Sequence, residues 1–290
     1  FAAGLLTTAA VTQAVAQVAP SGDPAKLATD EAYWSKAAGF YDWPRDVIQL
    51  EAGQFGAMAR PVQAAYETYL RRINRETTLY TRTTMFDDLA KVRAKAAAML
   101  GVDVEEIVWT RGGTESMMTL IGGYNRLKAG DAVLYADLDY DSMQVGMASL
   151  ARTRGVRVVR IDLPEPASRQ GLIDTYDAAL KANPDVRLML LTHLSHRTGL
   201  IPPVKDIVAM ARGRGVDVLL DCGHALGQTE FALRDLDVDF AGLNLHKWIG
   251  APIGAGALKP ACREVFAVFL QAGGERGARG GAGEAEPEPV

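Results

Sequence analysis

The sequence predicts an α/β fold in which helices cover both faces of a mostly parallel sheet. From about residue 107 onward, short apolar segments alternate with amphipathic segments at the spacing typical of strand–helix units. The chain has 290 residues, of which 48% are hydrophobic, enough for one large domain with a sizeable core. Polar and glycine-rich segments follow the predicted strands, and parallel sheets bind ligands beyond those strand ends. These observations predict a ligand-binding α/β domain.

The predicted elements follow from the periodicity of apolar residues. Helical spacing predicts helices over 27–40, 61–76 and 87–100, and Gly101 fits the end of the third one. Beyond it, strands are expected at 107–109, 132–135, 157–161, 186–191 and 218–220. Helices are expected between them at 114–127, 142–154, 174–182 and 204–214. A further apolar segment ends at Asn244, so the sheet is expected to extend to that residue.

Composition divides the chain into four parts. Residues 1–20 are apolar and small, and they resemble the hydrophobic and cleavage regions of an export signal; an ordinary Ala-rich helix is the alternative. A signal would place the protein in the periplasm or outside the cell, and otherwise it would be cytoplasmic. Residues 21–60 form an N-terminal segment, and 61–260 form the large domain. Residues 261–290 form a short C-terminal segment, which from about residue 273 is rich in Gly, Glu and Pro and is expected to be disordered.

Charge and composition argue against several classes of partner. The net charge is -4 and the sequence shows no basic face, so a nucleic-acid partner is not expected. The first 20 residues are too short and too weakly apolar for stable membrane insertion. Two cysteines give no disulfide framework, and the four histidines lack the spacing of a zinc site. No metal is predicted.

An acid and a lysine at the ends of two apolar segments indicate the chemistry. Asp221 ends one segment, and Lys247 follows the other beside Trp248. A buried lysine can form a Schiff base with an aldehyde, and a buried carboxylate can pair with a pyridinium nitrogen. These are the minimum groups for pyridoxal phosphate (PLP) chemistry. The alternatives are a loop or capping acid and an exposed lysine whose stem packs on the surface.

A glycine-rich turn suits a phosphate. The segment Thr110-Arg111-Gly112-Gly113-Thr114-Glu115-Ser116 joins a predicted strand to a predicted helix. Glycines allow close approach of the backbone to an anion, and a helix N-terminus offers free N–H groups beside the Thr114 hydroxyl. Simple helix capping is the alternative explanation of this segment.

These motifs together resemble one enzyme family. HKW before a glycine-rich run, DCGHALG, TRGGTES, DLDYDSMQ, THLSHRTGLIPPV and YWSKAAGFYDWPRDVIQLEAGQFGAMARPV are similar to the class V aminotransferase family of fold-type I PLP-dependent enzymes. Within that family the chain looks most like the isopenicillin N epimerase-like branch. The resemblance covers about residues 30–260. It implies a homodimer that binds PLP and acts on a small-molecule substrate, an amino acid or an amine, by transamination, epimerisation or carbon–sulfur cleavage.

The resemblance also implies roles for individual residues. Lys247 would be the Schiff-base lysine, Asp221 would pair with the pyridine nitrogen, and His224 would lie near the ring hydroxyl. Tyr140 would stack on the ring. The remaining cofactor contacts would come from Gly113 and Thr114 at the phosphate, helped by Asn244 and His246, and from Thr198 on a loop that closes over the cofactor. For His224 and Tyr140, packed side chains without a role are the alternative.

The chain departs from the family pattern in two ways. His196 and Cys222 stand where many relatives have other residues, and Cys222 is expected to be a core residue. Family members continue past the lysine into a C-terminal small domain, which this sequence is expected to lack for the most part. The alternative function is therefore a truncated or non-catalytic relative that folds, or binds PLP, without turnover.

Overall fold

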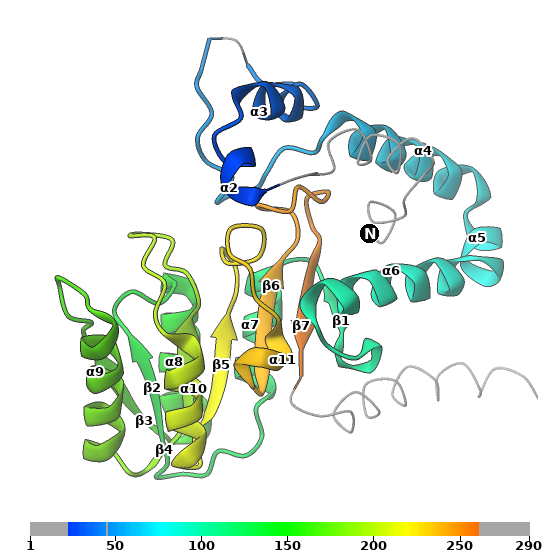
Figure 1. Ribbon diagram of the computed structural model, residues 1–290. Coiled ribbons are helices and arrows are strands. Elements are labelled where there is room, and N and C mark those ends of the chain that lie inside the picture. The colour runs from blue at the N-terminus through cyan, green and yellow to red at the C-terminus, as the bar shows by residue number, and fades with distance from the viewer. Residues whose placement is uncertain (1–22, 45, 261–290) are drawn as a thin grey trace, which may run out of the picture.

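The sheet has seven strands, and all but one run parallel. The computed structural model describes residues 23–44 and 46–260, and the sheet order is β1-β7-β6-β5-β4-β2-β3 (Figure 1). The strands are β1 (Val108–Thr110), β2 (Ala132–Ala136), β3 (Arg157–Ile161), β4 (Val186–Thr192), β5 (Asp217–Asp221), β6 (Phe240–Asn244) and β7 (Gly256–Lys259). The predicted α/β architecture is confirmed, and each expected strand lies within two residues of its predicted bounds.

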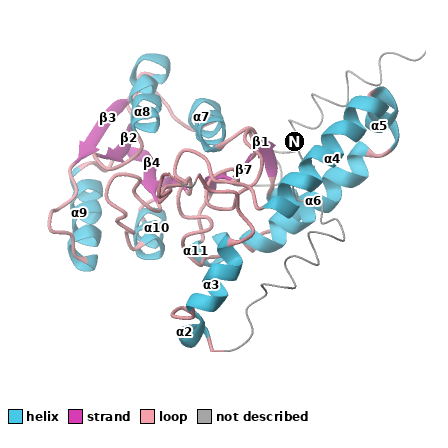
Figure 2. Ribbon diagram, turned by 90° about the horizontal axis from the view of Figure 1, so that it is seen from above, coloured by secondary structure: helices cyan, strands magenta, loops and turns pink. Residues whose placement is uncertain are grey.

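Helices cover both faces of this sheet, as Figure 2 shows from above. One face carries α7 (Gly113–Gly123) and α8 (Asp141–Arg154), and the other carries α9 (Arg169–Ala182), α10 (Val204–Gly213) and the short α11 (Leu233–Leu236). The central strands β2, β4, β5 and β6 are mostly apolar because both of their faces are buried, whereas the edge strand β3 contains two arginines and is partly exposed. In β4, Leu188 and Leu190 pack in the cluster with α7 and α8, and Met189 and Leu191 in the cluster on the opposite face.

The antiparallel strand β7 was not predicted from the sequence. It pairs with β6 and with β1, and within the described residues β1 joins the sheet through β7 alone. Thr110 of β1 and Asn244 of β6 both pair with Gly256, so these three residues form one row across the sheet. The last described strand therefore connects the first strand to the centre of the sheet.

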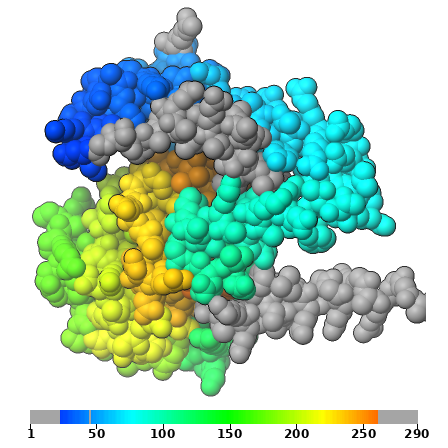
Figure 3. Space-filling model, turned by 45° about the vertical axis from the view of Figure 1, so that its right-hand side comes forward, coloured from blue at the N-terminus to red at the C-terminus, as the bar shows by residue number. Residues whose placement is uncertain are grey.

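The N-terminal part forms an arm of helices that begins above the carboxyl ends of the parallel strands and ends beside the β1 edge of the sheet (Figure 1). Its helices are α2 (Pro24–Leu27), α3 (Glu31–Ala38), α4 (Arg60–Glu76), α5 (Thr78–Thr83) and α6 (Met85–Leu100), followed by a 3₁₀ turn, η2 (Val104–Glu106). Figure 3 shows this part, in blue and cyan, lying over the sheet domain. The helix predicted over 27–40 is wrong in its extent, because Asp30 begins a new helix by accepting a hydrogen bond from the Tyr33 N–H.

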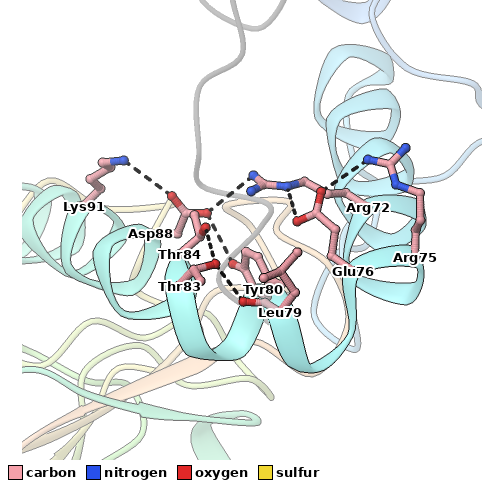
Figure 4. Close-up of polar contacts among 9 residues, drawn as sticks. All are labelled: Arg72, Arg75, Glu76, Leu79, Tyr80, Thr83, Thr84, Asp88 and Lys91. Carbon is pink, nitrogen blue, oxygen red and sulfur yellow. Dashed lines mark hydrogen bonds and ion pairs between the residues drawn. The ribbon is translucent and has the colours of Figure 1, made fainter.

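A buried carboxylate joins the last three helices of this arm (Figure 4). Asp88 in α6 accepts a hydrogen bond of 3.3 Å from the Tyr80 hydroxyl, and Lys91 lies 3.4 Å from its other oxygen. Arg72 of α4 reaches within 4.0 Å of Asp88 and lies over the Tyr80 ring. A buried carboxylate is stable when such partners surround it. The contacts fix α4, α5 and α6 as one unit.

Two predictions fall on residues outside the described part of the chain. These are the export-signal segment 1–20 and the C-terminal segment 261–290. Among the helices that the structure describes, none is both long and apolar enough to cross a membrane. The residues at 23–44 and 46–260 also contain no group of three or more His, Cys, Asp or Glu placed to hold a metal ion.

Candidate active site

A cavity of about 710 Å³ lies beyond the carboxyl ends of β1, β4, β5 and β6. This is the position expected for a ligand of a parallel sheet. Most of the predicted site residues line it. The wall contains Glu51, Gly53, Gln54, Arg111, Gly112, Gly113, Thr114, Glu115, Tyr140, Met143, Thr192, Leu194, His196, Asp221, Gly223, His224, Asn244, His246 and Lys247.

The predicted phosphate segment forms one end of this cavity. The Gly113 N–H, at the first turn of α7, donates a hydrogen bond of 2.7 Å to Asn244 Oδ1. A Cβ at Gly113 would lie 2.6 Å from Asn244 Nδ2, and one at Gly256 would lie 2.5 Å from the Gly112 Cα. The backbones at Gly112 and Gly256 therefore lie too close for a side chain between them, and the Asn244 side chain packs directly against Gly113. His246 is fixed beside them, with Nδ1 at 2.9 Å from the Ala255 carbonyl oxygen.

Asp221 places a carboxylate in the cavity wall at the end of β5. It is 8% exposed, and its Oδ1 accepts a hydrogen bond of 2.9 Å from the Gly223 N–H. Burial raises its pKa, and the Gly223 N–H and the charge of Lys247 lower it. A carboxylate at this depth is stabilised by a cationic partner, which a protonated ring nitrogen would supply.

Lys247 and His224 form a contact inside the cavity. Lys247 Nζ lies 3.1 Å from His224 Nε2, and the Trp248 indole N–H donates to His224 Nδ1 at 3.4 Å. Burial lowers the pKa of Lys247, and burial together with the charge of Lys247 lowers the pKa of His224 to about 4. The imidazole is therefore neutral near pH 7, and the amine is more nucleophilic than a surface lysine.

Four rings run in a row across the cavity. Tyr140 makes an edge-to-face contact with His196 at 5.1 Å between ring centroids. His196 lies 6.2 Å from His224, which in turn lies 6.4 Å from Trp248. His196, for which no role was predicted, therefore lies between Tyr140 and His224 and contacts the Tyr140 ring.

Asp139, which precedes Tyr140, is a buried residue for which no role was predicted from the sequence. Asp139 Oδ1 accepts hydrogen bonds from both the N–H and the hydroxyl of Thr192, and Oδ2 accepts one from the Ala136 N–H. Burial raises the pKa of Asp139 to about 7. These bonds join the ends of β2 and β4 and so fix the start of α8, where Tyr140 lies.

The N-terminal segment closes one side of the cavity, which the sequence did not predict. Gly56 donates from its N–H to the His246 carbonyl at 2.7 Å, and a Cβ at Gly56 would lie 2.0 Å from the Lys247 carbonyl oxygen. A Cβ at Gly53 would lie 2.9 Å from His224 Cε1 and 2.4 Å from the Glu51 carboxylate. The only sequence signal was the glycine pair itself, because contact between segments so far apart leaves no periodic pattern.

Thr198 is not brought to the cavity wall. It is exposed, and its hydroxyl accepts a hydrogen bond of 3.3 Å from the Leu200 N–H. Its assignment as a cofactor contact stays a prediction. Cys222 is a core residue, as expected, with its sulfur 3.6 Å from His193 Nδ1.

The family was identified by comparison with known proteins. The model of the Aminotransferase class-V family matches residues 57–276. Among the curated relatives are a cysteine desulfurase IscS of Anaeromyxobacter dehalogenans, 31% identical over 65% of this chain and 46% of that protein, and the isopenicillin N epimerase of Streptomyces clavuligerus, 27% identical over 78% of this chain and 56% of that protein. The chain thus spans about half the length of the curated relatives it matches.

Solved structures share the fold. The cysteine desulfurase CsdA of Escherichia coli superposes with a TM-score of 0.65 at 23% identity, covering 83% of this chain and 58% of that one. A mutant of C-DES with glycine linked covalently to its PLP cofactor gives a TM-score of 0.65 at 20% identity, covering 72% of this chain and 55% of that one. The parallel sheet, the cavity beyond its strand ends and the match over residues 57–276 lead to one conclusion: the chain belongs to the class V aminotransferase family.

Proposed function

We propose that this chain is the PLP-binding part of an enzyme that acts on an amino acid or a related amine. One observation carries the proposal. The Lys247 amine, the Asp221 carboxylate and the glycine segment Gly112–Gly113 line the same cavity, although they come from three different strand ends. PLP, the cofactor of the family, needs an amine, an acid and an anion-binding backbone in one place.

The described residues fit PLP. The cavity has the size of a cofactor pocket, and its wall includes Gly113 and Thr114 at the start of α7, where a helix N-terminus favours an anion. In this arrangement Gly113, Thr114 and Asn244 would hold the phosphate, and Asp221 would hold the ring nitrogen. Tyr140 would cover the ring face, and Lys247 would hold the aldehyde carbon.

Each residue has a separate chemical task. PLP, when bound, withdraws electrons from the substrate and so stabilises negative charge at the substrate's α carbon. Asp221 would favour a proton on the ring nitrogen, because a buried carboxylate is stabilised by a cationic neighbour. Lys247 Nζ would carry a proton to or from the substrate, and burial, which lowers its pKa, favours the neutral amine more than in an exposed lysine.

For the reaction type, the proposal names a group of candidates rather than a single reaction. Isopenicillin N epimerase and cysteine desulfurases are among the relatives, so epimerisation, transamination and carbon–sulfur cleavage are the candidates. Cys222 is buried in the core, and burial raises the pKa of its thiol well above the usual value. Cys222 is therefore not a nucleophile for the substrate.

Borohydride reduction of the protein with PLP, followed by peptide mapping, tests the proposal. We expect a pyridoxyl group on Lys247 and none in Lys247→Ala. Lys205→Ala, which removes an exposed lysine of α10, is the matched control and should keep the adduct. An adduct of unchanged yield in Lys247→Ala would refute the assignment. An adduct on Lys247 without exchange of the α-proton of any amino acid would favour the alternative, a relative that binds PLP without turnover.

A further inference from the structure

His224 is in contact with a different donor or acceptor at each of its ring nitrogens. Nδ1 accepts a hydrogen bond from the Trp248 indole N–H at 3.4 Å, and Nε2 lies 3.1 Å from Lys247 Nζ. An indole N–H can only donate, so Nδ1 must be the unprotonated nitrogen. The single proton of a neutral imidazole is then on Nε2, where it faces the lysine amine.

The Nε2–H of His224 can form a hydrogen bond with only one protonation state of the Lys247 side chain. An ammonium group has three donors and no acceptor, so it would face the Nε2–H with a proton of its own. A neutral amine has a lone pair that accepts the Nε2–H. We propose that Trp248 is a positioning residue that fixes His224 in the Nε2–H tautomer, and that this tautomer favours the neutral, nucleophilic amine of Lys247.

The charged groups around Lys247 and His224 raise and lower the pKa values of this pair. Asp221 and Glu51 both favour the charged form of Lys247, while burial disfavours it more strongly, so that the pKa of Lys247 is lowered overall. The pKa of His224 is about 4, because burial and the charges of Lys247 and His196 outweigh the opposing charge of Glu51. His224 is therefore neutral at pH 7, and its tautomer is the variable that Trp248 can set.

The backbone holds Trp248 in place for this role. Gly227, at φ +93°, approaches so closely that a Cβ there would lie 2.9 Å from both the carbonyl carbon and the Cβ of Trp248. On the preceding residue, Gly56 packs against the Lys247 carbonyl oxygen. Two glycine contacts from separate segments therefore fix the direction in which the indole and the amine point. His224 itself is anchored through its carbonyl, which accepts a hydrogen bond of 2.9 Å from Gln228 Nε2.

The inference rests on the proposed function in one respect, which is that Lys247 captures PLP. The role of Trp248 is to make this capture efficient near neutral pH. Loss of the indole N–H would free His224 to adopt the other tautomer, whose Nε2 accepts from an ammonium group. The fraction of neutral amine at a given pH would then fall.

Two measurements on the cofactor-free protein test this inference. The first is nitrogen NMR of the protein labelled with ¹⁵N-histidine, with the His224 signals assigned by their loss in His224→Gln. We expect the Nε2–H tautomer to dominate in the unsubstituted protein and to share the population with the Nδ1–H tautomer in Trp248→Phe. A dominant Nδ1–H tautomer in the unsubstituted protein would overturn the inference without any variant being needed.

The second measurement is the rate of PLP capture against pH, with the site of capture mapped after borohydride reduction. In Trp248→Phe, the loss of one hydrogen bond should slow capture at pH 7 by about 3- to 10-fold and shift the pH profile upward. Capture at high pH should be unchanged, because the amine is then neutral in any case. A structural defect would slow capture at every pH, and this result would also overturn the inference.

Two controls separate the possible failures. Trp34→Phe removes another indole hydrogen bond, the one to the Leu27 carbonyl at 3.0 Å, and should leave the pH profile unchanged. In a His224→Gln background, Trp248→Phe should have no further effect on the profile. A further effect there would show that Trp248 acts by another route. Absence of capture at Lys247 in the unsubstituted protein would instead refute the proposed function.

Discussion

At the scale of single residues, Asp221 is a carboxylate that the fold keeps buried at the end of β5. Its main chain is fixed by the pairing of β5, and the Gly223 N–H donates a hydrogen bond to one carboxylate oxygen.

The sequence predicted Asp221, Lys247, His224 and Asn244 correctly as neighbours in one cavity, because each ends or follows a strand of a parallel sheet. It did not predict Glu51 or Gly53, since their contacts depend on how a distant segment packs.

Asp221→Asn should separate cofactor binding from catalysis. Asparagine keeps the shape of the side chain and loses the charge that, in the proposed function, holds a proton on the ring nitrogen of PLP. We expect PLP capture at Lys247 to persist while exchange of the substrate α-proton slows by ~100-fold. Deuterium incorporation from D₂O, followed by NMR over a set of amino acids, measures this rate. Exchange at the original rate would contradict the assignment.

His193 should make the protein less stable in mild acid. Burial lowers its pKa to about 4, and the unfolded chain has a value of ~6.5. Between these values the unfolded state binds more protons, so the free energy of unfolding falls as the pH is lowered through this window. From pH ~6.5 to ~5 the loss from His193 is about 2 kcal/mol. Well above pH ~6.5, His193 is neutral in both the folded and the unfolded state, so this loss is absent.

His193→Phe isolates this contribution. Phenylalanine keeps a ring against Phe231, which His193 contacts at 4.6 Å between centroids, and it cannot titrate. Urea unfolding at two pH values should show a smaller acid loss in the variant than in the unsubstituted protein. The raised pKa values of Asp139 and Asp221 act in the opposite direction, and comparing the two proteins cancels them. Equal losses would show that His193 does not drive the effect.

At the scale of elements, the predicted strands and helices agree with the structure where the pattern is long and apolar. The helices predicted over 61–76 and 87–100 correspond to α4 and α6. The strand β7 was missed because it has four residues and directly follows a glycine-rich loop, which masks the start of a strand. The short α5 was missed for a similar reason, since six residues cannot show a helical period.

Gly256→Ala should damage the phosphate end of the cavity. A Cβ at this position would lie 2.5 Å from the Gly112 Cα and 2.6 Å from its nitrogen, so β7 or the glycine segment must move. We expect the affinity for PLP to fall by ~10-fold or more, equivalent to ~1.4 kcal/mol. Fluorescence titration of the cofactor-free protein measures this affinity.

Gly213→Ala is the matched control for this change. Gly213 ends α10, and a Cβ there would meet no atom within 4 Å. The substitution should leave PLP affinity unchanged and should increase helix stability by ~0.5–1 kcal/mol. If Gly256→Ala bound PLP as tightly as this control, the close approach of the two backbones would not matter for the site.

At the scale of the whole molecule, large apolar side chains are exposed on the N-terminal arm. Ile48 and Leu50 are each 85% exposed, and Phe86 is 71% exposed. Exposed apolar groups favour association, and identical chains usually associate through a two-fold axis. We therefore expect a homodimer whose interface includes this arm.

Ile48→Lys combined with Leu50→Lys should weaken this dimer by at least ~10-fold in Kd, because lysines replace apolar contacts in the interface. Light scattering across a dilution series measures the change. Val145→Lys, on α8, is the control, since Val145 is also 69% exposed and lies on a different surface. A dimer weakened equally by both changes would show that the arm is not the interface.

The pairing of β1 with β7 has a consequence for the order in which the protein is made. Thr110 and the glycine segment after it are translated early. The two residues in the same row of the sheet, Gly256 and Asn244, are translated much later. At ordinary rates of translation, roughly 150 residues correspond to about 7–30 s. During that interval the central strands can already pair, whereas β1 has no strand to join. The end of the cavity at Gly112 and Gly113, where we propose that the phosphate binds, is therefore expected to be completed last, so a nascent chain would become able to retain its cofactor only as β7 emerges.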